Sequence, residues 1–287
     1  EQIGYPVILK STAGGGGIGM RQCEDAVSLQ QAFYGVKRLA EDNFGDAGVF
    51  VEQYVTQARH VEVQVIGDGR GRVLAVGDRD CSLQRRQQKV IEECPAPCLP
   101  DDLRAKLHES ARNLLANVKY RGVGTVEFIY DEKRRQAAFL EVNTRLQVEH
   151  GVTEMVYGID LVEWMVRLAE GSLPEIDELA AKLSPNGHAM QARIYAEDPA
   201  EDFRPSPGLI THAAFPADST ELRVDTWVTS GSQVSPNFDP LLAKVITHGY
   251  NREASRKALL AALNDTLLYG TQTNLAYLRQ VMVMDEF

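Results

Sequence analysis

The chain has 287 residues, enough for a sizeable core and roughly two domains. Its 30 lysines and arginines stand against 40 aspartates and glutamates, and the resulting net charge of −10 argues against general binding to nucleic acid or anionic membranes. No apolar run approaches the roughly 20 residues of a membrane span, and the N-terminus has no pattern typical of a secretory signal. We therefore expect a cytoplasmic protein.

The first predicted element is the buried strand YPVILK (residues 5–10), followed by STAGGGGIGM and a helix around residues 24–39. Glycines let the backbone approach a bulky anion with several N–H groups, and a lysine at the strand end can neutralise phosphate charge. This order of strand, glycine loop and helix favours phosphate binding, although a flexible linker has the same composition. The stretch matches neither the P-loop pattern nor a good dinucleotide fingerprint.

Short alternating strands separated by turn residues, as in an antiparallel sheet, are predicted next at residues 49–55, 59–69 and 72–80. The segment CSLQRRQQKVIEE (residues 81–93) packs Arg85, Arg86 and Lys89 between glutamines. Such a run is typical of a solvated loop, and an anion-binding role is the alternative. A helix is predicted to follow Asp101, where acidic residues favour a helix N-terminus.

Two further strands, GVGTVEFIYDE (residues 122–132) and QAAFLEVNTRLQ (residues 136–147), are predicted to pair through a short turn. In the first, Glu127 lies on the face opposite Val126 and its apolar neighbours. In the stretch FLEVNTRLQVEH, read as extended chain, one face carries only polar residues. They are Glu141, Asn143, Arg145, Gln147 and Glu149.

A hard cation such as Mg²⁺ takes a few oxygen ligands together with nucleotide phosphates. Glu127, Glu141 and Asn143 could supply these ligands if the two strands pair. A straight strand would hold Glu149 too far away to join them. A half-buried strand with a solvated outer face, or a cross-strand Glu and Arg pair, explains the same residues without any ligand.

The second half of the chain begins with a long helix predicted over residues 153–169 and closed by Gly171. After residue 187 the sequence changes to short β-rich segments and ends in two predicted helices, so we place a domain boundary near that residue. The four cysteines are too sparse for a disulfide framework, and we expect them to be reduced thiols.

Together these segments resemble the biotin carboxylase family, a branch of the ATP-grasp enzymes, over nearly the whole chain. The motifs that carry the resemblance are YPVILKSTAGGGGIGM, RHVEVQV, RDCSLQRRQQKVIEECPAP, GTVEFIY, FLEVNTRLQVEHGVTE, HAMQARIYAEDP and FRPSPG. The wording STAGGGGIGM, with RVDTWV at residues 223–228, looks most like the biotin carboxylase domain of urea carboxylases. Ile18 and Gln87 stand where acyl-CoA and pyruvate carboxylases usually carry a basic residue and a histidine, a departure that argues against a phosphate contact from those two positions.

The resemblance implies an α+β chain with an ATP-grasp fold and a C-terminal β-rich domain. Its implied parts are a partial lid subdomain with the glycine-rich loop (residues 1–56), an ATP-grasp central domain with an antiparallel sheet (57–186) and the biotin carboxylase C-terminal domain (187–287). It also implies that the N-terminal domain of the family, which would precede Glu1, is absent. We therefore expect a fragment with little activity alone.

The resemblance also assigns roles by position. Nucleotide binding is implied for Lys10, Gly14, Gly15, Gly16, Gly17, Glu52, Val55, His60 and Gln84. Binding of Mg²⁺ or Mn²⁺ is implied for Glu127, Glu141 and Asn143. Catalytic roles are implied for Lys89 and Arg145, which would seat bicarbonate with the loop at Gln147 and Val148, for Glu149 as general base, and for Arg193 facing the ureido oxygen of biotin.

The predicted function is ATP- and bicarbonate-dependent carboxylation of biotin through carboxyphosphate, as in urea carboxylase. The implied partners are bicarbonate, biotin on a carrier domain outside this chain, a carboxyltransferase in the same polypeptide or in trans, and a second copy in a homodimer. Two alternatives stay open: another ATP-grasp carboxylate–amine ligase, and a non-catalytic nucleotide-binding module.

Overall fold

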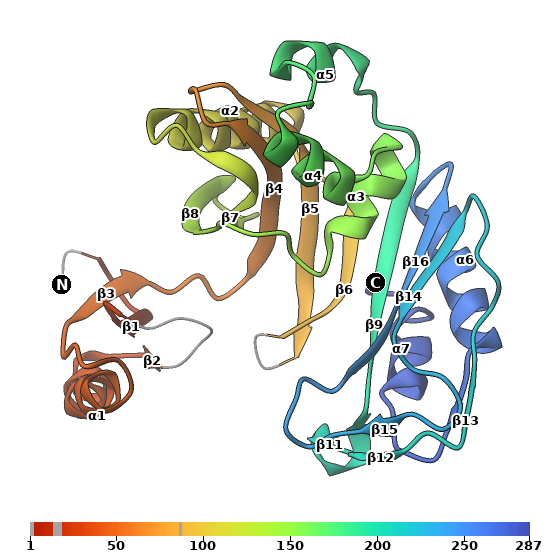
Figure 1. The fold of residues 1–287 in the computed structure, drawn as a ribbon. Helices are drawn as coiled ribbons and strands as arrows, with labels where there is room; N and C mark the ends of the chain where they lie inside the picture. The colour runs from red at the N-terminus through yellow and green to blue at the C-terminus, as the bar shows by residue number, and fades with distance from the viewer. Residues whose placement is uncertain (1–2, 14–18, 86–87) are drawn as a thin grey trace. The chain divides into compact units, whose positions relative to one another are not determined.

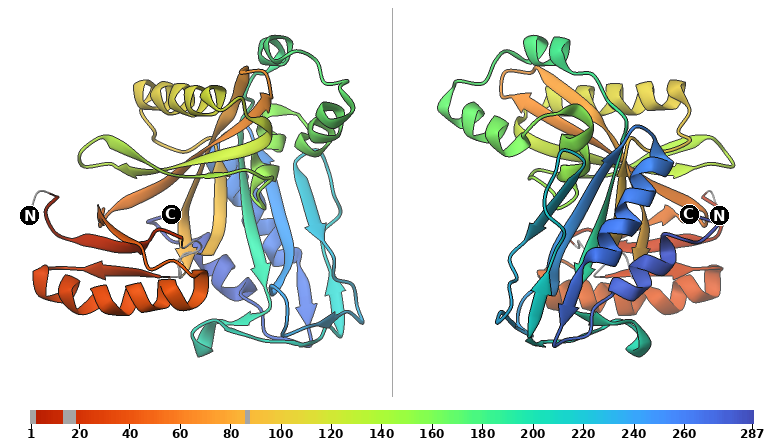
Figure 2. Two further views of the ribbon diagram at one scale, coloured as in Figure 1. Left: turned by 60° about the vertical axis from the view of Figure 1, so that its left-hand side comes forward. Right: turned by 90° about the vertical axis from the view of Figure 1, so that its right-hand side faces the viewer.

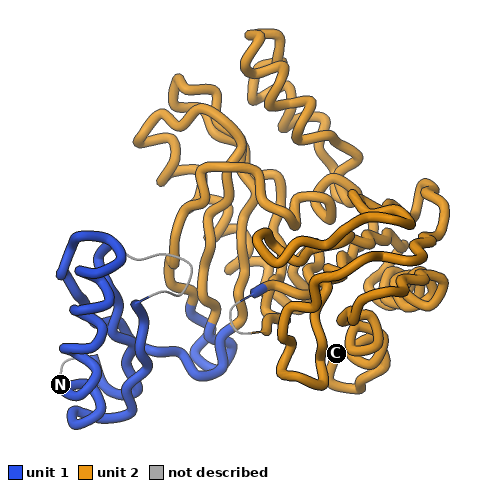
Figure 3. Tube along the Cα trace, turned by 60° about the horizontal axis from the view of Figure 1, so that its bottom comes forward, with its two compact units in different colours: residues 1–58, 86–88, 131–136 blue, residues 59–85, 89–130, 137–287 orange. Residues whose placement is uncertain are grey.

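The computed structural model describes residues 3–13, 19–85 and 88–287. The chain divides into two compact units (Figure 3). The first contains residues 1–58, 86–88 and 131–136, and the second contains residues 59–85, 89–130 and 137–287. The glycines predicted to bind phosphate, Gly14 to Gly17, lie outside the described residues.

The first unit is a small sheet covered by one helix. Its strands are ordered β2-β1-β3 and pair antiparallel, with β1 at Val7–Ser11, β2 at Met20–Cys23 and β3 at Val49–Gln53. Helix α1 (Ala26–Phe44) begins at Asp25, whose side chain accepts a hydrogen bond from the backbone N–H of Ser28. It ends at Gly45, which adopts the left-handed conformation that closes many helices.

The second unit is built on a sheet that, in the described part of the chain, has eight strands in the order β14-β16-β9-β6-β5-β4-β7-β8 (Figure 1). The strands are β4 (Ala58–Asp68), β5 (Val73–Arg85), β6 (Gln88–Cys94), β7 (Arg121–Asp131), β8 (Gln136–Asn143), β9 (His188–Tyr195), β14 (Leu222–Thr226) and β16 (Leu241–Gly249). Strand β9 pairs antiparallel with β6, so the sheet continues across residue 187. The domain boundary near this residue stays a prediction.

Helix α2 (Asp101–Asn117) covers one face of the β4 and β7 end of this sheet. Its buried residues pack against alternate residues of both strands, including Val63 on β4 and Phe128 on β7. Because side chains alternate along a strand, the residues between them, such as Glu62 and Glu127, point to the opposite face. That opposite face holds the candidate site.

Three shorter helices follow β8: α3 (His150–Tyr157), α4 (Leu161–Glu170) and α5 (Ile176–Lys182). Leu161 and Trp164 of α4 belong to a core cluster with β4 and β5 residues. The prediction of one long helix over residues 153–169 was wrong. Gly158 ends α3 in the left-handed conformation, and Asp160 starts α4 by accepting a hydrogen bond from the N–H of Glu163.

The remainder of the chain is β-rich and ends in two helices, as predicted. Helices α6 (Arg252–Asp265) and α7 (Leu275–Val281) lie beside β9 and β16 in Figure 2 and share a core cluster with them. The short elements of this part of the chain are β10 (Glu197–Asp198), η1 (Pro199–Glu201), β11 (Arg204–Pro205), β12 (Gly208–Leu209), β13 (His212–Ala214), β15 (Gln233–Val234) and β17 (Leu267–Tyr269).

Two further sequence predictions are corrected by the sheet. The polar stretch at residues 139–150 is not one strand, because β8 ends at Asn143 and α3 begins at His150. The segment at residues 81–93 is not a loop throughout, because β5 extends to Arg85 and β6 begins at Gln88. The cysteines are free thiols, as predicted. Among the described residues, no helix is long and apolar enough to cross a membrane.

Candidate active site

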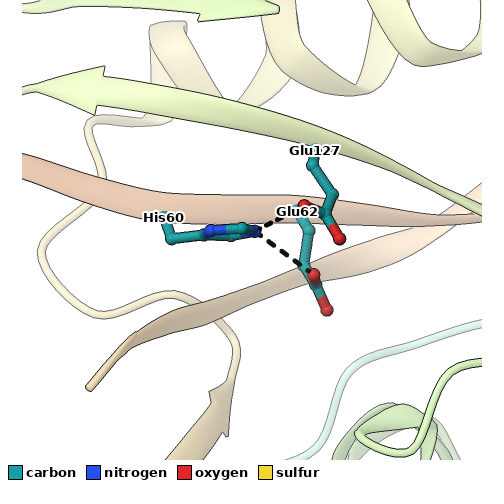
Figure 4. Close-up of side chains that lie close together, drawn as sticks. All are labelled: His60, Glu62 and Glu127. Atoms are coloured by element: carbon teal, nitrogen blue, oxygen red, sulfur yellow. Dashed lines mark ion pairs between the residues drawn. The ribbon is translucent and has the colours of Figure 1, made fainter. Parts of the chain in front are cut away.

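Charged side chains gather on the face of the second unit's sheet opposite α2. His60 and Glu62 come from β4, Lys89 from β6 and Glu127 from β7. Figure 4 shows the ring of His60 directed at the carboxylates of Glu62 and Glu127. Glu149 joins them from the residue immediately before α3. A straight strand would have held Glu149 away from Glu127. The chain turns after β8 instead, and this turn brings Glu149 back to the sheet.

Lys89 is the cation at the centre of this cluster. Its Nζ donates to Glu62 at 2.6 Å, to Glu149 at 2.5 Å and to Glu127 at 3.2 Å. Burial alone would lower the pKa of Lys89, but the surrounding negative charges raise it well above its ordinary value. Lys89 is therefore a permanent positive charge shared by three carboxylates.

Glu62 is fully buried and accepts hydrogen bonds from two cations. Arg79 Nε donates to one carboxylate oxygen at 2.6 Å, and Lys89 Nζ donates to the other. Burial raises the pKa of Glu62, but the charges of Arg79 and Lys89 outweigh it and lower that pKa to about 2. Glu62 is therefore ionised at neutral pH.

Glu127 accepts hydrogen bonds from three segments: Lys89 on β6, Asn143 on β8 and Gln147 in the turn after β8. Its Oε1 accepts hydrogen bonds from Gln147 at 2.8 Å and from Asn143 at 2.9 Å. His60 Nε2 lies 2.9 Å from its Oε2, outside the alignment of a good hydrogen bond. Burial raises the pKa of Glu127, but His60 and Lys89 lower it to about 2. The result is a charged carboxylate at neutral pH.

Asn143 connects Glu127 with Glu141. Its amide N–H₂ donates to Glu127 at 2.9 Å and to Glu141 at 3.4 Å. Glu127 is buried, whereas Glu141 is exposed to solvent. The two carboxylates therefore lie at the inner and outer ends of this part of the sheet face. The two carboxylates provide hard oxygen donors of the kind that Mg²⁺ and Mn²⁺ prefer, and the Asn143 amide presents its nitrogen to both of them.

Glu149 lies between two cations and is 2% exposed. Its Oε1 accepts from Lys89, and its Oε2 accepts from Arg193 Nη2 at 3.0 Å. Arg193 Nε also donates to Glu92 at 2.5 Å. Burial raises the pKa of Glu92 from its ordinary value. The arrangement holds Glu149 in one orientation.

Not every predicted site residue belongs to this cluster. Gln84 Nε2 lies 3.2 Å from His60 Nδ1 and so borders it. Arg145 is exposed, and within the described residues its guanidinium donates to the neighbouring carbonyl of Leu146 rather than to Glu149. The structure thus places the predicted catalytic residues Lys89, Glu149 and Arg193 together and leaves Arg145 outside.

The other predicted nucleotide contacts belong to the first unit. Lys10 on β1 and Glu52 on β3 form an ion pair with each other. Val55 lies two residues beyond the end of β3. Lys10 and Glu52 are thus neighbours on a small sheet.

Three charged members of the site were missed in the sequence: Glu62, Arg79 and Glu92. Glu62 stands at an alternate position of RHVEVQV, so the period-2 pattern could have placed it on the polar face. Arg79 stands between two aspartates in GDRDC and is fully buried, which no local pattern reveals. Buried charges need partners, and those partners are distant in sequence.

Residues 1–176 match the family model of the carbamoyl-phosphate synthase L chain ATP-binding domain, and residues 191–287 match that of the biotin carboxylase C-terminal domain. The chain belongs to the biotin carboxylase family. The structure has the ATP-grasp biotin carboxylase fold with a C-terminal domain, so the predicted α+β class is confirmed. The cluster around Lys89 lies within the residues that match the ATP-binding domain model.

Among relatives of this chain, urea amidolyase of Saccharomyces cerevisiae is 52% identical over 286 residues, which is all of this chain and 15% of that protein. Kluyveromyces lactis urea carboxylase has a TM-score of 0.77 and 53% identity, covering 80% of this chain and 20% of that one. The biotin carboxylase domain of 2-oxoglutarate carboxylase from Hydrogenobacter thermophilus, a dimer in complex with MgADP and bicarbonate, has a TM-score of 0.92 and 36% identity. It covers all of this chain and 62% of that one.

Proposed function

We propose that this chain performs the biotin carboxylation step of a biotin-dependent carboxylase, as the biotin carboxylase domain of a urea carboxylase. The observation that carries the proposal is a buried carboxylate, Glu149, held between Lys89 and Arg193. A general base needs a fixed position next to its substrate, and a developing anion needs cations nearby. The high identity to urea amidolyase supports urea as the acceptor of the complete protein.

In this proposal Glu149 removes the proton from bicarbonate, so that the bicarbonate oxygen can attack the γ-phosphate of ATP. Lys89 lies against Glu149 and stabilises the negative charge that spreads over the reacting oxygens. Arg145, which has an exposed side chain in this structure, would help to seat bicarbonate from the rim of the site. Carboxyphosphate then releases CO₂ beside biotin.

Glu127, Glu141 and Asn143 would hold Mg²⁺ or Mn²⁺, since their oxygen donors fit such a cation. The cation would neutralise charge on the nucleotide phosphates. His60 and Gln84, with Lys10, Glu52, Val55 and the glycines at residues 14–17, are the proposed nucleotide contacts. Low folded-state pKa values keep the Glu127 carboxylate charged for this role at neutral pH.

Arg193 would face the ureido oxygen of biotin, whose enolate-like anion a guanidinium can stabilise. Its Nε is bound to Glu92, and its Nη2 is bound to Glu149, so the guanidinium is fixed before any substrate arrives. The biotin would come from a carrier domain outside this chain. We further propose the three parts 1–56, 57–186 and 187–287 as its domains, and a homodimer, a carrier and a carboxyltransferase as its partners.

The test is made on the full-length polypeptide, because little activity is expected of these residues alone. It assays ATP hydrolysis with and without bicarbonate, and carboxylation of free biotin with radiolabelled bicarbonate. Lys89→Ala and Arg193→Ala should both abolish biotin carboxylation. Arg252→Ala is the matched control, because Arg252 also binds a buried carboxylate, that of Glu93, outside the cluster. It should stay active.

ATP cleavage that requires an acceptor other than bicarbonate would replace the proposal with a different ATP-grasp ligase. Nucleotide binding without any bicarbonate-stimulated ATP cleavage would favour a non-catalytic module. Full activity of both Lys89→Ala and Arg193→Ala would contradict the assigned roles.

A further inference from the structure

Arg79 on β5 is a fully buried arginine at the base of the cluster. A guanidinium has five N–H donors, and here each has an acceptor. Nε donates to Glu62 at 2.6 Å. Nη1 donates to Gln64 at 2.6 Å and to Thr153 at 3.0 Å, and Nη2 donates to Thr125 at 3.1 Å and to Gln147 at 3.3 Å.

These acceptors come from four different segments: Glu62 and Gln64 from β4, Thr125 from β7, Thr153 from α3, and Gln147 from the turn before α3. Glu62 and Arg79 stand directly opposite each other in the β4–β5 register, which sets the starting point of the side chain. One rigid planar group therefore joins three strands of the cluster to the α3 segment.

Two of these acceptors, Glu62 and Gln147, are also hydrogen-bonded to residues of the proposed reaction site. Glu62 binds Lys89 through its second oxygen at 2.6 Å. Gln147, whose oxygen accepts from Arg79, uses its amide nitrogen to donate to Glu127 at 2.8 Å. Arg79 thus reaches both the central cation and the proposed metal-binding carboxylate in two steps, without touching either.

We infer that Arg79 is a positioning residue of the biotin carboxylation reaction, which fixes Lys89 through Glu62 and fixes the bicarbonate-seating turn through Gln147. The inference rests on the proposed function. Lysine could not replace it, because an ammonium group has three donors at a single point and cannot satisfy five acceptors in a plane. Misplacement of reacting groups by about 1 Å can cost roughly a hundredfold in rate.

A buried arginine can also serve stability alone, and the two roles predict different kinetics. Loss of stability lowers the amount of folded enzyme, and it leaves the KM for bicarbonate unchanged. Loss of positioning changes the folded enzyme itself, so the KM for bicarbonate rises and kcat falls.

The experiment measures kcat and the KM for bicarbonate in the full-length polypeptide, as wild type, Arg79→Lys and Gln147→Met, with folded enzyme quantified by circular dichroism. Arg79→Lys should lower kcat/KM for bicarbonate by about a hundredfold. Arg79→Lys combined with Gln147→Met should lose less than the product of the two single effects, because both act through one contact. Arg104→Lys is the matched control: Arg104 binds the buried Asp78, next to Arg79 in sequence, and touches no member of the cluster. Its kinetics should match wild type.

Unchanged kcat and KM in folded Arg79→Lys would overturn the inference, as would effects that simply multiply in the double variant. If Arg79→Lys does not fold, Thr153→Val removes one acceptor of the same guanidinium at nearly constant volume. A raised KM for bicarbonate in Thr153→Val supports the inference, and an unchanged one overturns it. An inactive full-length wild-type polypeptide would instead refute the proposed function, so the two failures are distinguishable.

Discussion

Glu149→Gln tests the reaction centre with a small change in shape. The substitution removes one negative charge from a carboxylate that is 2% exposed and bound to Lys89 and Arg193. Both cations retain other anionic partners, since Lys89 also binds Glu62 and Glu127, and Arg193 also binds Glu92. The amide keeps one oxygen that can still accept a hydrogen bond.

The expected cost in stability is therefore the loss of one charge-assisted hydrogen bond, about 2 kcal/mol. Loss of a general base costs roughly 10²- to 10⁴-fold in rate, which corresponds to about 3 to 5 kcal/mol of activation free energy. Native proteins have about 5 to 15 kcal/mol of stability, so nearly all Glu149→Gln molecules should stay folded. The rate loss should thus far exceed any loss of folded protein.

The assay compares bicarbonate-dependent ATP cleavage and biotin carboxylation with the free energy of unfolding from denaturant titration. Glu154→Gln is the matched control. Glu154 is also buried and accepts from Arg223 at 2.6 Å and from the N–H of Leu161 at 2.7 Å, but it lies outside the cluster. It should lose similar stability and retain activity.

Activity of Glu149→Gln within tenfold of wild type would refute the general-base role. Equal rate losses in Glu149→Gln and Glu154→Gln would show that the effect comes from general destabilisation of the α3 segment.

Two further predictions concern the metal and the pH dependence of stability. Glu141→Gln should weaken Mg²⁺-dependent ADP binding by about tenfold or more, whereas the control Asp131→Asn, at the end of the neighbouring strand β7, should not weaken it. Equal ADP affinities of the two variants, measured by calorimetry, would argue against Glu141 as a ligand. Burial raises the pKa of Asp78, but His108 and Arg104 outweigh burial and lower that pKa below its ordinary value of 3.8. The charged Asp78 side chain therefore stabilises the fold fully above pH 3.8. This stabilisation is lost as the pH falls through the pKa of Asp78 in the folded protein. Asp78→Asn should therefore cost about 3 kcal/mol at pH 7 and progressively less in acid, and a difference in unfolding free energy that stays constant with pH would contradict this.

The sequence by itself determined the family through the resemblance of its motifs. It also determined the α+β class and most elements, because elements follow from local patterns. Alternation placed Glu127 opposite Phe128, whereas the predicted order of strand, glycine loop and helix missed strand β2 (Met20–Cys23), which precedes α1. The same patterns failed where a short turn interrupts a continuous polar or helical stretch. The end of β8 at Asn143 and the break at Gly158 are examples, because their flanking residues continue the local period.

Only the tertiary structure decided which charges share the site. Lys89, Glu62, Glu149 and Arg193 belong to separate segments, and their distances depend on strand order and on the turn before α3. Arg79 shows most clearly what the sequence cannot reveal. Its residue type is evident from the sequence, but its burial and its five hydrogen-bond acceptors exist only after β4, β5, β7 and α3 have packed together. A charge is stable in the interior only when distant partners surround it, so the sequence cannot reveal its role before the fold assembles those partners.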